Sequence, residues 1–355
     1  NTHFSTMSKT ARAYALRNEG QGNKRRALGD ISNNEARASK FANGKKMNKT
    51  GAVSSYGTNV RPTPPNDAAS RTKSSARRVS SSARHVNIDA ADESNPQACT
   101  NYVNEIYAHF RNTEGIHGPQ SNYMSFQKDI NEKMRAILFD WLVEVHLKFR
   151  LKTETLYLTF NLIDRFLERV QVSRSKLQLV GVTCLLLASK YEEIYPPEVR
   201  DLVYVTDKAY TRSQILRMEG VIIRALDFRL TVPTHYKFLV RYIKAAQCDT
   251  RTKLIAYYFC EKCMPEFEML CFKPSIIASA AVLLALKSQD ASKQWSSTLE
   301  HYTKYTLEDI TPCAHKIIAI VQLAEKSTSL QAIRKKYAQA KFGDAAGAAF
   351  RVKSL

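Results

Sequence analysis

Two long apolar segments of this chain align with each other without a gap, and this repeat limits the folds that are available to it. Residues 176–190 (KLQLVGVTCLLLASK) and 273–287 (KPSIIASAAVLLALK) both begin and end with lysine and carry small residues centrally. A helix that is apolar on every side and lined with Gly and Ala is surrounded by neighbours that approach it closely. The pattern predicts two similar helical bundles, each built round one of these segments.

Helical periodicity recurs around both central segments, and no run of alternating strand residues is present. We therefore predict an all-α fold of two tandem five-helix domains. The first set of helices is expected at about 134–149, 154–168, 175–192, 198–203 and 212–226, and the second at about 233–247, 251–263, 274–289, 297–303 and 307–325. Prolines are expected at the junctions, where helix starts tolerate them: Pro196, Pro197, Pro233, Pro265, Pro274 and Pro312.

Residues 134–150 (MRAILFDWLVEVHLKFR) predict a helix whose apolar arc is wider than one packing face requires. Neighbouring helices cover this arc completely, or part of it binds a partner. Steps of three and four residues put an apolar track that ends in a carboxylate on one line of the helix. Such a track suits a peptide that carries a leucine and an arginine, and it consists of Met134, Ile137 or Leu138, Trp141 and Glu144.

These segments resemble the cyclin box, most closely that of the mitotic A- and B-type cyclins. The resemblance rests on MRAIL with DWLVEV (134–145), LYLTFNLIDRFL (156–167), KLQLVGVTCLLLASKYEEIYPPEV (176–199) and YTRSQILRMEGVIIRALDF (210–228), and it covers about 100–330. It implies a non-catalytic subunit that binds and activates a mitotic cyclin-dependent kinase at the G2/M transition. Tyr191 and a tail motif described below favour the B type over the A type.

The resemblance also implies the functions of particular side chains. In that family the MRAIL helix docks Arg-x-Leu peptides of substrates and inhibitors, which assigns the track on residues 134–144 to a docking patch, together with Gln178. The kinase-binding residues implied are Lys190, Tyr191, Glu219 and Phe228. Without the resemblance, the charges that follow residue 189 indicate only a solvated helix end.

Arg135 and Asp164 are charged residues within otherwise apolar helical stretches. A charge in such a place is tolerated only when it finds a partner. We expect the two to form a buried ion pair, as the matching positions do in the resembling family. Their role is therefore structural.

Composition divides the chain of 355 residues, whose formal net charge is +20. Residues 1–95 hold 17 Lys and Arg against 7 Asp and Glu, and few large apolar residues, so we expect a disordered basic tail. Asn95 and Pro96 signal the start of a helix at about 97–112 that packs on the cyclin box. The predicted divisions are a tail at 1–95, cyclin-fold domains at 96–230 and 231–330, and a C-terminal tail at 331–355.

One short motif stands out in the basic tail. Arg25, Leu28 and Asn33 have the spacing of the destruction box by which mitotic cyclins are captured for ubiquitination. In an extended segment a guanidinium, an isobutyl group and an amide reach three separate pockets. The resemblance thus implies a ubiquitin ligase as a further partner, and the downstream lysines are possible acceptors: Lys40, Lys45, Lys46 and Lys49.

Other classes of protein fit the sequence less well. No apolar run reaches the roughly 18 residues of a membrane span, and no signal peptide is recognisable. The seven scattered cysteines suit a reducing compartment, so we expect the nucleus and cytoplasm. The chain begins at Asn1, and Met7 is a plausible start.

Enzyme and metal motifs are missing. Cys260 and Cys263 form a lone C-x-x-C with no second ligand pair, so we expect buried thiols and neither a metal nor another cofactor. The alternative class is a DNA-binding protein of the same fold, like a general transcription factor. The net charge favours it, but the charge lies mostly in the tail. We therefore expect no direct nucleic-acid binding.

Overall fold

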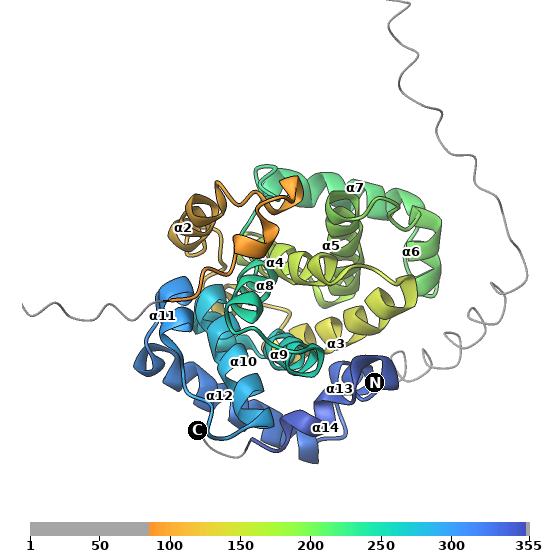
Figure 1. The fold of residues 1–355 in the computed structure, drawn as a ribbon. Helices are drawn as coiled ribbons and strands as arrows, with labels where there is room; N and C mark the ends of the chain where they lie inside the picture. Colours follow the sequence, from red (N-terminus) through yellow and green to blue (C-terminus); the bar gives the residue numbers. More distant parts are fainter. Residues whose placement is uncertain (1–84, 353–355) are drawn as a thin grey trace, which may run out of the picture. The chain divides into compact units, whose positions relative to one another are not determined.

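Helices form the regular structure of residues 85–352, the part of the chain that this computed structural model describes, and this part contains no strand (Figure 1). The helices of the first repeat are α3 (Glu132–Phe149), α4 (Thr153–Arg169), α5 (Leu177–Glu192), α6 (Val199–Val205) and α7 (Arg212–Ala225). Those of the second are α8 (His235–Ala245), α9 (Thr250–Cys263), α10 (Pro274–Gln289), α11 (Ser297–Thr303) and α12 (Leu307–Lys326). The predicted ten helices are confirmed, with ends within two residues of those expected.

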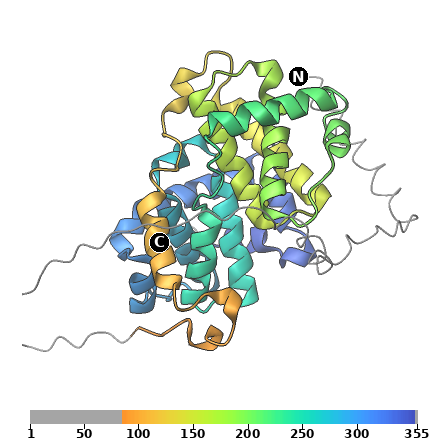
Figure 2. The same ribbon diagram turned by 90° about the horizontal axis from the view of Figure 1, so that it is seen from above.

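Each central apolar segment lies inside its own bundle. Helix α5 contacts α3, α4 and α7, whereas α10 contacts α8, α9 and α12. Gly181 of α5 permits the close approach of α3, because a Cβ there would lie 2.7 Å from Cδ1 of Leu138. Figure 2 shows the two groups of helices side by side, with the first repeat in green and the second in teal and blue.

Local signals fix the helix ends. The Asn131 side chain accepts a hydrogen bond from the Met134 amide (3.0 Å) and caps α3. A capping box at Thr211 starts α7, and another at Thr306 starts α12. Pro312 lies inside α12 rather than at the junction predicted for it, because Thr306 has already fixed the first turn upstream.

The N-terminal helix packs on a different domain from the one predicted. Helix α2 (Val103–Thr113) follows short 3-10 turns at Ala90–Asp92 and Pro96–Ala98. It packs on the second repeat, because Tyr107 donates a hydrogen bond to the carbonyl of Lys237 (3.0 Å) and Phe110 packs edge-on against Phe238. The expectation that it packs on the first box is wrong, since its aromatic side chains meet their partners on α8.

Residues 85–95, which composition assigned to the tail, also pack on the second repeat. Asp89 binds Arg241 of α8 (Nη2–Oδ2, 2.7 Å) and Lys244 (2.9 Å). Burial of Ile88 beside these ion pairs adds an apolar contact. A few residues with well-matched partners thus order a stretch whose average composition predicts disorder.

The segment expected as a C-terminal tail, 331–355, is also helical in its described part. It contains α13 (Ala332–Tyr337), a 3-10 turn at Ala340–Phe342 and α14 (Ala345–Ala349). Helix α13 contacts both α3 and α9, and α14 contacts α9 and α10. Further 3-10 turns lie at Tyr123–Phe126, Arg174–Lys176 and Phe267–Cys271. Among residues 85–352, no helix combines the length and the apolar character needed to cross a membrane.

Candidate functional site

Arg135, on the helix of the MRAIL segment, is a buried structural residue. Its guanidinium makes two hydrogen bonds to Asp164 of α4 (2.6 and 2.7 Å) and donates a third to the carbonyl of Pro265 (2.9 Å) in the second repeat. Tyr123 donates its hydroxyl to the same carboxylate (2.7 Å). Burial alone would lower the pKa of Arg135, but the charge of Asp164 outweighs that effect and raises it. The predicted ion pair is confirmed, and it also joins the two repeats.

The docking-patch residues on α3 differ in their exposure. Leu138 and Trp141 are buried, with 3% and 8% of their surfaces exposed, and Leu138 rests on Gly181. Met134, Ile137 and Gln178 are half-buried, and Glu144 is exposed. The accessible part of the track is therefore an apolar shelf formed by Met134 and Ile137, and the track ends at the Glu144 carboxylate.

Glu144 lies in an environment that discourages its charge. Although its side chain is exposed to solvent, partial burial by the surrounding protein and the neighbouring Asp140 carboxylate raise its pKa, whereas Lys335 of α13 lowers it. A carboxylate in this setting gains from a cation that binds to it. The end of the shelf can therefore accept a guanidinium.

The four residues assigned to kinase binding lie at the end of α5, on α7 and in the linker after α7. Lys190 at the end of α5 donates to Glu219 of α7 (2.7 Å), so one ion pair joins both helices. Tyr191 shares a hydrogen bond with the hydroxyl of Thr231 (2.5 Å), which follows Phe228 in the linker to the second repeat. The structure thus joins α5 to α7 and to the linker through residues that lie up to 40 positions apart in the sequence.

Phe228 is held in an unfavourable backbone conformation. It and Asp227 have φ of 58° and 52°, in the left-handed region that residues with a Cβ seldom adopt. Such a conformation costs about 1–3 kcal/mol per residue and is concentrated at functional sites. Here it accompanies an aromatic ring that is 70% exposed.

Two more exposed apolar side chains adjoin Tyr191, which is 45% exposed. Ile194 and Tyr195 are each 80% exposed, in the loop between α5 and α6. Sequence reasoning did not include them, although both lie within the KYEEIYPP block that supported the resemblance. Exposed side chains of this size, gathered at one place, are typical of protein interfaces.

Two family models match this chain in succession. The cyclin N-terminal domain matches residues 105–231 and the cyclin C-terminal domain matches residues 233–349. The chain belongs to the cyclin family. The expected family and all-α fold of two tandem cyclin domains are thereby confirmed.

The relatives of this cyclin include plant B-type cyclins. Cyclin-B2-1 of Oryza sativa subsp. japonica is 48% identical over 261 residues, which are 74% of this chain and 62% of the relative. Cyclin-B1-2 of Arabidopsis thaliana is 46% identical over 74% of this chain and 58% of its own length. The G2/mitotic-specific cyclin-1 of Medicago sativa subsp. varia is 45% identical over 72% of this chain and 59% of its own. The chain thus spans about three fifths of the length of these relatives.

A solved structure supports the fold. The X-ray structure of a viral cyclin from herpesvirus saimiri aligns with a TM-score of 0.56 at 20% identity, over 61% of this chain and 96% of that one.

The degradation-signal residues Arg25, Leu28 and Asn33 lie outside the described residues, so this assignment stays a prediction.

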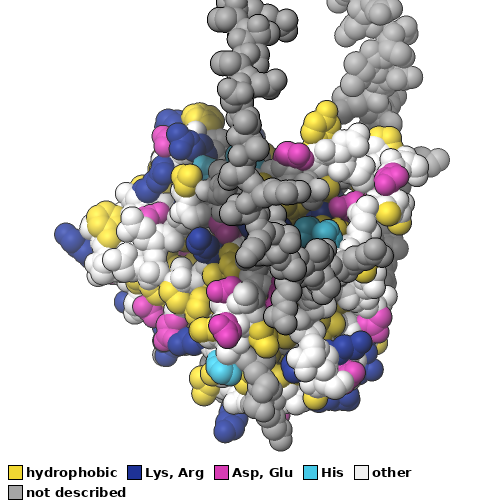
Figure 3. Space-filling model, turned by 60° about the vertical axis from the view of Figure 1, so that its left-hand side comes forward, with side chains coloured by type: hydrophobic (Ala, Val, Ile, Leu, Met, Phe, Trp, Pro, Cys, Tyr) yellow, Lys and Arg dark blue, Asp and Glu magenta, His cyan; other side chains and the backbone are white. Residues whose placement is uncertain are grey.

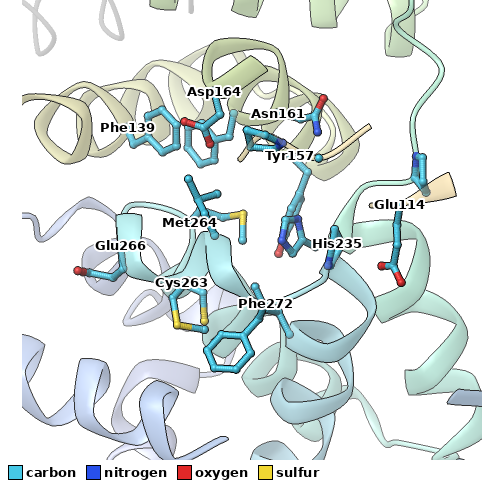
Figure 4. A pocket seen from close by; sticks show the side chains of 18 of the residues that line it. Glu114, Phe139, Tyr157, Asn161, Asp164, His235, Cys263, Met264, Glu266 and Phe272 are labelled. Carbon is cyan, nitrogen blue, oxygen red and sulfur yellow. The ribbon is translucent and has the colours of Figure 1, made fainter. Parts of the chain in front are cut away.

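The cavity between the two repeats of this cyclin is small. Figure 4 shows Phe139, Tyr157 and Asp164 from the first repeat facing Met264 and His235 from the second. Its volume of about 60 Å³ is far below the roughly 300–1,000 Å³ of typical ligand pockets. Burial lowers the pKa of His235 to about 4, which keeps the imidazole neutral near pH 7. The cavity is a gap in packing rather than a nucleotide site.

The C-x-x-C thiols are buried, and burial raises the pKa of Cys260 to about 12. Cys263 donates to the carbonyl of Phe259 (3.1 Å) within its own helix. Within residues 85–352, no group of His, Cys, Asp and Glu side chains is arranged to hold a metal ion.

Surface charge bears on the DNA-binding alternative. Figure 3 views the face that carries α2 and α11, and basic and acidic side chains lie interspersed over its coloured part. A continuous basic stripe, which would attract a phosphate backbone, is not visible there. The expectation of no direct nucleic-acid binding stays a prediction.

Proposed function

We propose that this cyclin is the activating, non-catalytic subunit of a mitotic cyclin-dependent kinase. The observation that carries the proposal is the surface at the end of α5, where the Lys190–Glu219 pair joins α5 to α7, Tyr191 is exposed, and the exposed Phe228 follows α7. Its apolar side chains gain by burial against a partner. The B-type names of the relatives support a mitotic role.

The proposed mechanism is stabilisation of the active kinase conformation. Kinases require a Lys–Glu pair between strand β3 and helix αC, together with an ordered activation loop. A surface that binds only the inward position of αC shifts the kinase towards that state by its differential affinity. The first repeat provides a rigid support for this surface, because α5 is packed between α4 and α7.

Substrate selection is assigned to the docking patch on α3. The peptide leucine would rest on Met134, Ile137 and the small exposed part of Trp141, and the peptide arginine would bind Glu144. The apolar shelf and the partly desolvated carboxylate support this arrangement. The partners proposed are therefore Arg-x-Leu substrates and inhibitors.

The signal for degradation of this cyclin is assigned to its N-terminal segment. Arg25, Leu28 and Asn33 would form a destruction box that delivers the chain to a ubiquitin ligase. The proposed location is the nucleus and cytoplasm, where such a kinase and ligase both act. Arg25→Ala with Leu28→Ala is expected to prolong the lifetime of the chain in mitotic extract.

The central test is activation of a co-purified kinase by paired variants. Lys190→Ala with Glu219→Ala should lower kinase activation at least a hundredfold, because it removes the polar contacts to the αC region. A matched control is Lys316→Ala with Glu268→Ala, which removes an exposed Lys–Glu pair from the second repeat. Circular dichroism should show the same helix content in both variants. Normal activation by the first variant would refute the assigned surface.

A further inference from the structure

Helix α13 extends along the docking helix and brings positive charge to it. The amide of Ala332 donates to Oδ1 of Asp140 on α3 (2.9 Å), which fixes the start of α13 against that helix. Ile333 and Tyr337 are buried and hold the rest of α13 in place. The position of α13 relative to α3 is therefore well determined by contacts at several points.

Two consecutive lysines of α13 point in different directions. Lys336 is 3% exposed and turns inward, where its ammonium binds both oxygens of Glu261 (2.7 Å each). Because successive helical residues are about 100° apart, the preceding Lys335 points elsewhere, and its side chain is exposed. Lys335 follows by three residues Ala332, whose amide binds Asp140, and α13 contacts α3, so the exposed Lys335 side chain lies beside α3.

Lys335 acts on the carboxylate that ends the docking track. Two charged residues near Glu144 change the pKa of its carboxyl group. Asp140 raises this pKa, and Lys335 lowers it. Burial raises the pKa of Asp140, and the Ala332 amide, Lys262 and Lys335 each oppose that rise. A lysine held near both carboxylates is a resident counter-charge at the place that an incoming arginine would occupy.

We infer that Lys335 is a specificity-determining residue of the docking patch, where it competes with the arginine of a bound peptide for Glu144. This inference rests on the proposed docking function. The patch then depends less on the peptide arginine and more on the apolar contact of its leucine. It also favours peptides with acidic residues near the arginine, because Lys335 can bind them.

The test measures peptide binding to the full chain by fluorescence anisotropy. One labelled peptide contains Arg-x-Leu, and the other is identical except for Gln in place of Arg. Lys335→Glu should raise the affinity of the chain for the Arg peptide about three- to tenfold at low salt, as expected for the reversal of an exposed charge. The gain should be absent for the Gln peptide and should shrink in 0.5 M salt.

Two controls separate the inference from the docking proposal. Lys293→Glu changes the net charge equally at an exposed loop of the second repeat and should leave the affinity unchanged. Met134→Ala, which alters a half-buried patch residue with little risk to folding, should weaken both peptides at least threefold.

If Met134→Ala leaves affinity unchanged, or the Arg peptide does not bind, the docking proposal fails and the inference fails with it. If Met134→Ala weakens binding but Lys335→Glu behaves like Lys293→Glu, the inference alone is wrong.

Discussion

The two repeats carry a buried carboxylate at the same place but obtain its positive partner differently. Residues 176 and 273, which begin the aligned segments, are 97 positions apart, and so are Asp164 on α4 and Glu261 on α9. Asp164 binds Arg135 from the first helix of its own repeat. Glu261 binds Lys336 from α13, beyond the tenth helix. Each also accepts a tyrosine hydroxyl at 2.7 Å, from Tyr123 and Tyr337 respectively.

The sequence offset explains the difference. The position that corresponds to Arg135 in the second repeat is Val232, which precedes α8 and carries no charge. The counter-charge of Glu261 comes instead from Lys336 of α13. The helices after α12 are accordingly part of the core of the second repeat.

The ends of the two central helices also differ. Lys190 of α5 binds Glu219 beside exposed aromatic residues, whereas the equivalent Lys287 of α10 donates to the carbonyl of Ala291 in its own loop (3.0 Å). Further along that loop Trp295 is buried and donates to the Tyr305 carbonyl (2.9 Å). The loop after α10 thus packs over the end of that helix, whereas the end of α5 keeps exposed aromatic side chains.

The largest expected effect comes from the first carboxylate. Asp164→Ala leaves the Arg135 charge buried without a partner, which should lower the free energy of unfolding by about 3–5 kcal/mol in urea titrations. The exposed pair of Glu198 and Arg200 supplies the control, since Glu198→Ala should cost under about 1 kcal/mol. A loss as small as that of the control would show that Arg135 finds other partners.

An intermediate effect is expected at the second carboxylate. Lys336→Met removes the only cation bound to Glu261 in the described structure and leaves it the Tyr337 hydroxyl, but α13 can detach and admit water, which limits the apparent loss to about 2–3 kcal/mol. Amide hydrogen exchange over 332–349 should accelerate, whereas α4 and α5 remain protected. Lys341→Met, at an exposed lysine of the same segment, should leave exchange unchanged. Uniform acceleration over both repeats would contradict the proposed local detachment.

The smallest effect concerns pH and the face of α3 towards α13. Burial, aided by the Lys336 charge, lowers the pKa of His146 to about 4, whereas an unfolded histidine has a pKa of about 6.5. The stability contributed by the neutral ring is therefore complete above about pH 6.5 and is lost as the pH falls towards 4. At about 1.36 kcal/mol per pKa unit, the loss should reach about 2 kcal/mol at pH 5.

This dependence is tested by unfolding at several pH values. His146→Gln retains a donor for the carbonyl of Lys152 and should flatten the slope between pH 6.5 and 4. His315→Gln, at an exposed site on α12, should leave the slope as it is. If the unmodified protein and both variants lose stability with falling pH at the same rate, His146 is not the source of the pH dependence.

Much of the fold could be predicted from the sequence because its signals are local. Helical periodicity located all ten helices, and the need to pair a buried charge predicted the bond between Arg135 and Asp164. The grouping of the kinase-binding residues, by contrast, came from the resemblance. Spacing alone did not relate Lys190 to Glu219, nor did it find Ile194 and Tyr195.

The amino-acid sequence by itself thus determined the helices, the repeat and the family, since each depends on residues close together along the chain. Only the tertiary structure decided where the flanking segments lie, because Asp89 meets Arg241 across 152 positions and Lys336 meets Glu261 across 75. It also decided which apolar residues of α3 stay accessible: Leu138 is covered because it packs on Gly181 of α5, whereas Met134 on the same helix stays half-exposed. Contacts between distant segments depend on shape and charge in three dimensions, which periodicity does not encode.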